Sequence, residues 1–75
     1  MLITIYTKNN CMQCTATKNI MDKQGLACQL INLDDEPAAI ENLKALGYRQ
    51  LPVVMADGDR WCGFRPDKLM RLAQG

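Results

Sequence analysis

The sequence predicts an α/β fold in which three helices cover a four-stranded mixed sheet, with the element order β-α-β-α-β-β-α. Two short apolar runs alternate with two stretches of helical periodicity over residues 2–47. Residues 53–62 then contain two further short runs around an Asp-Gly-Asp turn, and a last amphipathic stretch follows. Seventy-five residues, 48% of them apolar, suit one compact core, so we expect a single domain over residues 1–75.

The first predicted unit is a strand, a polar loop and a helix. Leu2–Tyr6 is short, β-branched and aromatic, which favours a strand, and the polar residues 7–10 follow it. Residues 12–24 contain neither proline nor glycine, and Gly25 stands where a left-handed helix cap is expected. The predicted buried face of this helix carries Ala16, Ile20 and Met21.

The second unit repeats the strand and helix. Cys28–Leu33 is predicted as a strand, and Pro37 after three acidic residues marks the start of a helix that ends at Gly47. A strand-helix-strand connection of the length found between residues 2 and 33 predicts parallel strands and a right-handed crossover. The predicted buried stripe of the second helix carries Ala39, Ile40, Leu43 and Leu46.

A hairpin and a third helix are predicted to complete the chain. Val53–Ala56 and Arg60–Cys62 flank the turn at residues 57–59, so these two strands should be antiparallel. Pro66 suits the first turn of a helix, and Asp67 complements the helix dipole. The inward face of this helix is predicted to carry Leu69, Leu72 and Ala73.

Charge and composition exclude several classes of function. Nine basic and eight acidic side chains leave a net charge of +1 without a charged block, so we expect neither nucleic-acid nor membrane binding. Residues 1–6 lack the features of a signal peptide, which favours the cytoplasm. In a reducing compartment, four cysteines should be catalytic, metal-binding or buried rather than a disulfide scaffold.

Cys11 and Cys14 form a C-x-x-C pair between the first predicted strand and the first predicted helix. This arrangement in a βαβ unit is typical of thiol-disulfide redox sites. Unpaired N–H groups and the positive end of the helix dipole stabilise a thiolate at Cys11, and Cys14 lies nearly one turn further on. We therefore predict that Cys11 is the attacking thiolate and Cys14 the resolving thiol of a dithiol oxidoreductase.

A zinc site is the main alternative for the cysteines. The chain contains no histidine and no second C-x-x-C motif, which argues against structural zinc. Cys28 alternates with Leu30 at the start of a strand predicted to be central in the sheet, so we interpret it as core packing. Two interpretations of Cys62 stay open. It is either a small buried side chain or a third reactive thiol that could form mixed disulfides or link two chains.

The element order, the C-x-x-C pair and a Leu-Pro-Val segment before the third strand give the chain a resemblance to the thioredoxin superfamily over its full length. Its four-strand, three-helix size is similar to that of a glutaredoxin. More closely it resembles the NrdH-redoxins, the glutaredoxin-like electron donors of class Ib ribonucleotide reductase. The motifs are Cys11-Met12-Gln13-Cys14, Gly47–Val54 (GYRQLPVV) and Trp61–Pro66 (WCGFRP).

The resemblance implies a thioredoxin/glutaredoxin-like fold, a redox-active disulfide and electron transport in deoxyribonucleotide synthesis. Thioredoxin reductase would supply the electrons and class Ib ribonucleotide reductase would accept them, with no cofactor bound to a monomeric chain. It also implies a cis peptide bond at Pro52, facing the disulfide. Cys62 departs from the family, which usually has serine there.

Seven residues around the predicted site are candidates for partner binding. They are Met12, Gln13, Leu51, Pro52, Trp61, Phe64 and Arg65. Trp61 and Phe64 flank a glycine in a loop expected beside the site, where an exposed aromatic patch suits a transient partner, although core packing is the alternative. Arg65 is either a surface charge or a steering group for a partner, and Gln13 lies between the two cysteines.

Two other functions share the predicted fold. A glutathione-dependent glutaredoxin needs a Gly-Gly-x-x-Asp turn with free backbone N–H groups. Here Phe64 adds bulk and Pro66 removes a donor, so we expect weak glutathione use although Asp67 remains. The second is a relative that holds an iron–sulfur cluster or metal through Cys11 and a second chain, whose colour and metal content would distinguish it.

Overall fold

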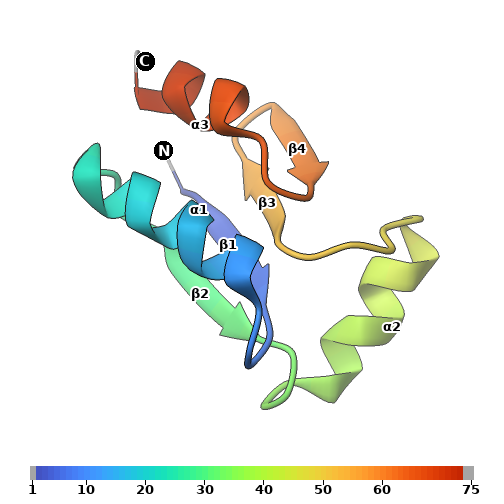
Figure 1. The fold of residues 1–75 in the computed structure, drawn as a ribbon. Helices are drawn as coiled ribbons and strands as arrows, with labels where there is room; N and C mark the ends of the chain where they lie inside the picture. Colours follow the sequence, from blue (N-terminus) through green and yellow to red (C-terminus); the bar gives the residue numbers. More distant parts are fainter. Residues whose placement is uncertain (1, 74–75) are drawn as a thin grey trace.

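The computed structural model describes residues 2–73 and confirms the predicted fold class (Figure 1). Within that range the chain forms four strands and three helices in the predicted order. They are β1 (Thr4–Thr7), α1 (Met12–Lys23), β2 (Gln29–Asn32), α2 (Pro37–Ala45), β3 (Val53–Ala56), β4 (Asp59–Cys62) and α3 (Pro66–Ala73). None of the helices described is long and apolar enough to cross a membrane.

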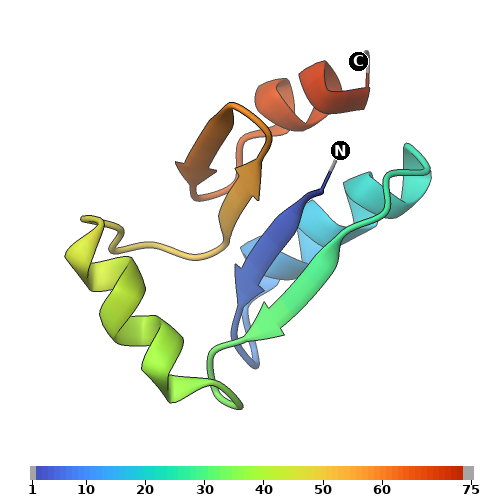
Figure 2. The same cartoon turned by 180° about the vertical axis from the view of Figure 1, so that it is seen from behind.

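The four strands form one mixed sheet in the order β2-β1-β3-β4. β1 pairs with β2 in parallel, and both the β1–β3 and β3–β4 pairs are antiparallel, which confirms the strand directions expected from the sequence. The parallel pair is joined through α1, and Figures 1 and 2 show α1 and α3 on one face of the sheet with α2 on the other. The polar loop that leads from β1 into α1 is therefore at one end of the central strands.

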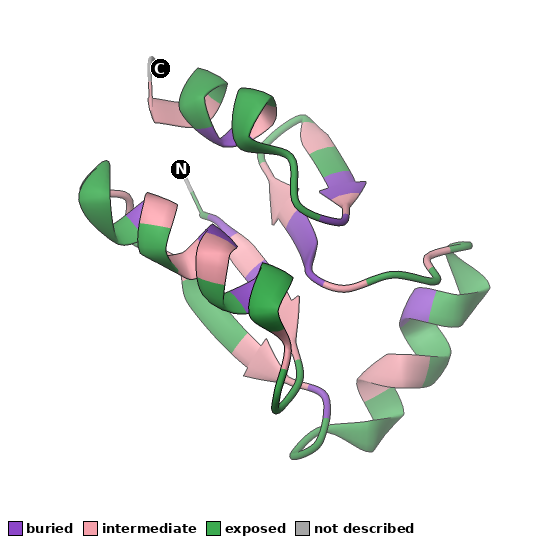
Figure 3. Ribbon diagram, viewed as in Figure 1, coloured by how far each residue is buried: buried purple, intermediate pink, exposed green. Residues whose placement is uncertain are grey.

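The larger part of the core lies between the sheet and the helices α1 and α3 (Figure 3). Ile5 pairs with Val54, and Val54 pairs with Trp61, so these three side chains share one face of the sheet. Met21 of α1 and Leu69 of α3 pack against them, and both are fully buried. The core thereby holds the C-terminal half of α1 against the sheet.

A smaller cluster lies on the opposite face, beneath α2. Its buried members are Leu33, Leu43 and Val53. The predicted inward position of Leu46 is wrong, because this side chain is 50% exposed. Leu46 is the C-terminal cap of α2 rather than part of the helix, so the three- and four-residue spacing no longer directs it towards the sheet.

Strand and helix ends differ from the sequence prediction by one or two residues. β1 begins at Thr4 instead of residue 2, because its pairing with β2 begins at Thr4 and Gln29. α1 ends at Lys23, and Gly25 follows with a φ of +70°, the left-handed conformation expected there. Thr17 is a buried polar residue of α1 that hydrophobic periodicity does not identify. Its hydroxyl donates to the carbonyl of Gln13 at 2.9 Å, which satisfies it within the helix.

Candidate redox site

Cys11 and Cys14 form a disulfide at the start of α1, with their Cα atoms 5.2 Å apart. Cys11 is the N-cap residue of the helix, with extended backbone angles (φ −110°, ψ 105°). The backbone N–H of Cys14 donates to Sγ of Cys11 at 3.2 Å. The sulfur therefore takes the place that a serine or aspartate oxygen occupies in an ordinary N-cap, next to the unpaired N–H groups of the first turn.

The two sulfurs differ in their access to solvent. Cys11 is half-buried, whereas Cys14 is only 4% exposed and lies on the inner side of the helix. A disulfide of a partner can reach only a thiol that is open to solvent, so the first cysteine is the better placed of the two for attack. The hydrogen bond from Cys14 N–H favours the thiolate form of Cys11 once the disulfide is reduced.

A turn with a cis peptide bond between Leu51 and Pro52 precedes β3, as the resemblance implied. The carbonyl of Pro52 accepts a hydrogen bond from the N–H of Gly63 at 2.8 Å, so this turn is tied to the loop after β4. Gly63 has a φ of +81°, and a Cβ there would lie 3.2 Å from Oε1 of Gln50. The positive φ favours glycine at this position, and a larger side chain would also require the end of the Gln50 side chain to shift.

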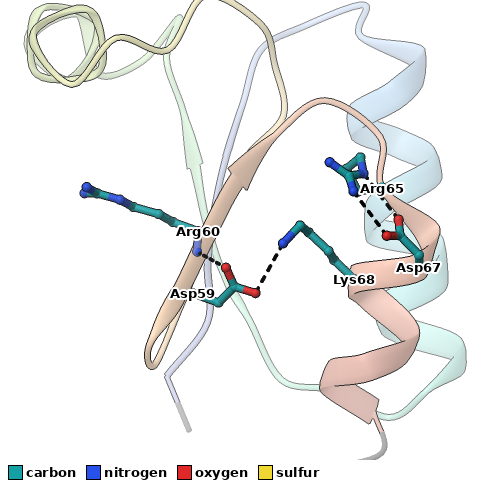
Figure 4. A network of polar contacts seen from close by, with 5 residues as sticks. All are labelled: Asp59, Arg60, Arg65, Asp67 and Lys68. Atoms are coloured by element: carbon teal, nitrogen blue, oxygen red, sulfur yellow. Dashed lines mark hydrogen bonds and ion pairs between the residues drawn. The ribbon is translucent and has the colours of Figure 1, made fainter.

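Arg65, in the loop between β4 and α3, forms an ion pair with Asp67 in the first turn of α3 (Figure 4). Nε and Nη2 of Arg65 donate to the two carboxylate oxygens of Asp67 at 3.3 and 3.2 Å. This bidentate contact is the main reason why the pKa of Asp67 lies below its usual value. The carboxylate of Asp67 is consequently engaged within the chain.

Two of the seven candidate partner residues are buried. The expectation that Trp61 contributes to an exposed aromatic patch is wrong, since its side chain is 5% exposed. Strand alternation points its ring at the core beneath α1 and α3, and Nζ of Lys68 lies 5.4 Å above the ring. Pro52 is also fully buried, so its ring offers no surface to a partner.

The other five candidates reach the surface to different degrees. Met12 is 87% exposed, although it is a large apolar side chain directly after Cys11. Gln13 and Arg65 are exposed, Phe64 is 37% exposed, and Leu51 is half-buried. Met12 therefore leaves a flexible apolar side chain open to solvent directly beside the disulfide.

A groove of about 570 Å³ runs between α2, the loop after β1 and the turn before β3. Its lining includes apolar residues such as Ile40, Leu43 and Leu51. The charged residues along it are Lys8, Asp34, Lys44 and Arg49. The sequence did not predict this groove, because its walls come from segments that are far apart in the chain. Its positively charged residues also form no cluster in the sequence that would distinguish them from other surface residues.

Cys28 and Cys62 are not in a disulfide. Cys28 packs against the larger core cluster, which confirms the packing role predicted for it, and burial raises the pKa of its thiol. The central strand expected there is wrong, because Cys28 precedes β2 and β2 is at the edge of the sheet. Cys62 is half-buried beside the smaller cluster. Within residues 2–73 there is no group of three or more cysteine, aspartate or glutamate side chains placed to hold a metal ion.

Comparison with known protein families identifies the family of this chain. The glutaredoxin family model matches residues 3–61. The chain belongs to the glutaredoxin family. This glutaredoxin family member is 54% identical over 72 residues to the glutaredoxin-like proteins NrdH of Salmonella typhimurium and Escherichia coli, covering 96% of the chain and 89% of each relative. It is 39% identical to NrdH of Lactococcus lactis, covering 96% of the chain and all of that relative.

Solved structures agree with this assignment. The structure of NrdH-redoxin from Escherichia coli, described by its thioredoxin-like activity profile, matches with a TM-score of 0.93 and 54% identity over 96% of this chain and 95% of that one. The thioredoxin-like protein BC3987 matches with a TM-score of 0.83 and 27% identity over 93% and 97% of the two chains. The predicted resemblance to the NrdH-redoxins and the thioredoxin/glutaredoxin-like fold are thus confirmed. With its Cys11–Cys14 pair, the chain is a thiol-disulfide oxidoreductase.

Proposed function

We propose that this protein carries two electrons from thioredoxin reductase to class Ib ribonucleotide reductase through Cys11 and Cys14. The main support is the asymmetry of the pair, in which a half-buried Cys11 caps α1 and Cys14 is buried behind it. The similarity to relatives named NrdH supports the choice of partners. The protein acts as a monomeric single domain over residues 1–75 in the cytoplasm.

Each transfer consists of two exchange steps. The thiolate of reduced Cys11 attacks a partner disulfide, whose S–S bond breaks as a mixed disulfide forms, and the released partner sulfur takes up a proton. Cys14 then loses its proton and attacks Sγ of Cys11, which expels the second partner sulfur. The partner leaves as a dithiol, reduced by two electrons, and the Cys11–Cys14 disulfide is restored. Two electrons from the reductase return the protein to the dithiol form, so the chain needs no bound cofactor.

The partner binds next to Cys11 through Met12, Gln13, Leu51, Phe64 and Arg65. Leu51 also lines the groove under α2, where three cations stand against one carboxylate. That combination of an apolar lining and an excess of positive charge is complementary to an acidic segment of a partner with apolar side chains. We expect such a segment beside the partner's redox cysteines.

Glutathione is a poor substitute for the protein reductase. Pro66 begins α3 and has no N–H to donate, and the carboxylate of Asp67 is already engaged by Arg65. A ligand amine that seeks this carboxylate has to displace a guanidinium that makes two hydrogen bonds. These features support the choice of thioredoxin reductase over glutathione as the source of electrons.

The deciding experiment reduces oxidised class Ib ribonucleotide reductase in two coupled assays. One supplies NADPH with thioredoxin reductase, and the other supplies NADPH, glutathione reductase and glutathione. We expect turnover in the first assay to exceed the second by at least about tenfold, and the Cys11→Ser variant to be inactive in both. Faster turnover with glutathione, or activity in the Cys11→Ser variant, would contradict the proposal.

A further inference from the structure

Three residues, one from the loop before the redox pair and two from the end of β2 and the turn after it, make a compact set of hydrogen bonds. The N–H of Asn9 donates to Oδ2 of Asp34 at 2.8 Å. Nδ2 of Asn32 donates to Oδ1 of Asn9 at 2.9 Å, and the N–H of Asp34 donates to Oδ1 of Asn32 at 2.9 Å. We call these three residues, Asn9, Asn32 and Asp34, the Asn9 clamp.

The clamp joins segments that are 23 and 25 residues apart in the chain. Asn9 lies in the loop between β1 and α1, and Asn32 and Asp34 lie at the end of β2 and just after it. The N–H of Leu33 also donates to the carbonyl of Thr7 at 2.8 Å, so the two loops leave adjacent strands side by side. The clamp therefore extends the β1–β2 pairing beyond the last ladder residues.

Cys11 follows the clamped residue by two positions, across an unusual backbone conformation. Asn10 has a φ of +59°, which only asparagine, aspartate and glycine adopt readily. The chain then enters the extended conformation of Cys11 and the first turn of α1. This sharp change of direction sets where Sγ of Cys11 lies relative to the N–H of Cys14.

Each contact of the clamp is exposed to solvent, so none is strong alone. Together they hold both the backbone N–H and the side chain of Asn9 in the short loop between β1 and α1. The carboxylate of Asp34 lines the groove and also accepts the hydrogen bond from the N–H of Asn9.

We propose that Asn32 and Asp34 are positioning residues for Cys11, holding the loop before α1 so that the sulfur stays over the N–H of Cys14. The inference rests on the proposed role of Cys11 as the attacking thiolate. It predicts that the clamp lowers the pH at which reduced Cys11 ionises. No residue of the clamp needs to touch a partner.

The test measures how the rate of alkylation of Cys11 by iodoacetamide depends on pH, in the reduced protein without any partner. Fragmentation of the labelled peptides in tandem mass spectrometry distinguishes Cys11 from the other three thiols, including Cys14 on the same peptide. We expect Asp34→Ala and Asn32→Ala to raise the midpoint of the profile by about half a pH unit or more. Asp34→Asn keeps an acceptor without the charge, so it should stay close to the parent protein.

Asp35→Ala is the matched control, because Asp35 is an exposed carboxylate next to the clamp whose side chain accepts none of its hydrogen bonds. The pH profile of Cys11 alkylation in this variant should match that of the parent protein. Two results would overturn the inference: lower melting temperatures for Asp34→Ala and Asn32→Ala with unchanged midpoints, or a lower midpoint for both Asp34 variants. Because no partner is present, failure of electron delivery to ribonucleotide reductase leaves this result interpretable.

Discussion

At the scale of single residues, the two sulfurs of the C-x-x-C pair are set apart by where the first turn of α1 places them. Cys11 is a half-buried N-cap residue, and Cys14 is nearly one turn further along on the buried side. In the proposed mechanism, the same local geometry that closes the disulfide leaves one sulfur accessible to the partner and keeps the other for resolution. This division of roles predicts what each cysteine variant does.

Replacing Cys14 by serine should stop the exchange after its first step. Cys11 still attacks the partner disulfide, but the resolving thiol is absent, so the mixed disulfide accumulates. Non-reducing electrophoresis after mixing with the oxidised partner measures it. Cys11→Ser is the matched control and should form no adduct through this site. Abundant adduct from Cys11→Ser and none from Cys14→Ser would reverse the assigned roles.

Cys28 provides a pH-dependent test of burial. Burial raises the pKa of its thiol, so the folded protein favours the protonated form. An unfolded chain ionises this thiol first, at its ordinary pKa of about 9.0. The stabilising contribution is therefore complete below that pH and is lost as the pH rises through the higher folded value.

The comparison protein is Cys28→Ser, which has a similar size and no group that titrates in this range. We expect the difference in free energy of unfolding between the parent and this variant to be constant from pH 6 to about pH 8. Above about pH 9 the parent should lose stability relative to the variant. Urea unfolding at each pH measures the difference, and parallel curves up to pH 10.5 would contradict the expectation.

At the scale of elements, α2 shows how far an amphipathic stripe specifies packing. Leu43 is buried in the smaller core cluster, whereas Leu46, three residues on, caps the helix and is half-exposed. Hydrophobic spacing identified both, because it describes a continuing helix and not the point where the helix stops. The cap residue has helical angles, but no further turn holds it over the sheet.

A pair of alanine variants tests this difference. Leu43→Ala removes a buried side chain and leaves a cavity, so we expect it to lower the free energy of unfolding by about 2–4 kcal/mol. Leu46→Ala should cost less than about 1 kcal/mol, since its side chain is already in contact with solvent. Chemical denaturation of both variants measures the costs. Equal losses would show that Leu46 packs in solution.

At the scale of the whole molecule, the groove is a product of the tertiary structure. The loop after β1, helix α2 and the turn before β3 contribute its charged and apolar lining, and they meet only because the sheet order is β2-β1-β3-β4. A net charge of +1 conceals the local excess of cations at this place. Local charge governs the encounter with a partner more than the total does.

Reversing two of these charges should weaken partner docking without affecting the chemistry. For the double variant Lys44→Glu, Arg49→Glu we expect the KM for oxidised ribonucleotide reductase to rise about fivefold to tenfold with little change in kcat. The difference should shrink in high salt, because both side chains are exposed. Lys23→Glu, at the far end of α1, is the control and should behave like the parent. An unchanged KM in the double variant would remove the groove from the docking surface.

The sequence alone was sufficient for the order of the elements, the redox pair and the core role of Cys28, because these depend on local periodicity and on residues close together in the chain. It failed for Trp61, whose burial depends on Val54 beside it in the sheet and on the helices above both. Nor did it identify the Asn9 clamp, although polar residues directly after two strands were a usable signal.

What the sequence by itself determined is the chemistry available at the start of α1: a C-x-x-C pair after a strand and before a helix, whose spacing brings two sulfurs within bonding reach. What only the tertiary structure decided is the surroundings of that pair. The side chains that hold Asn9, bury Trp61 and line the groove lie on other segments. Their meeting depends on long-range strand pairing, which local patterns do not encode.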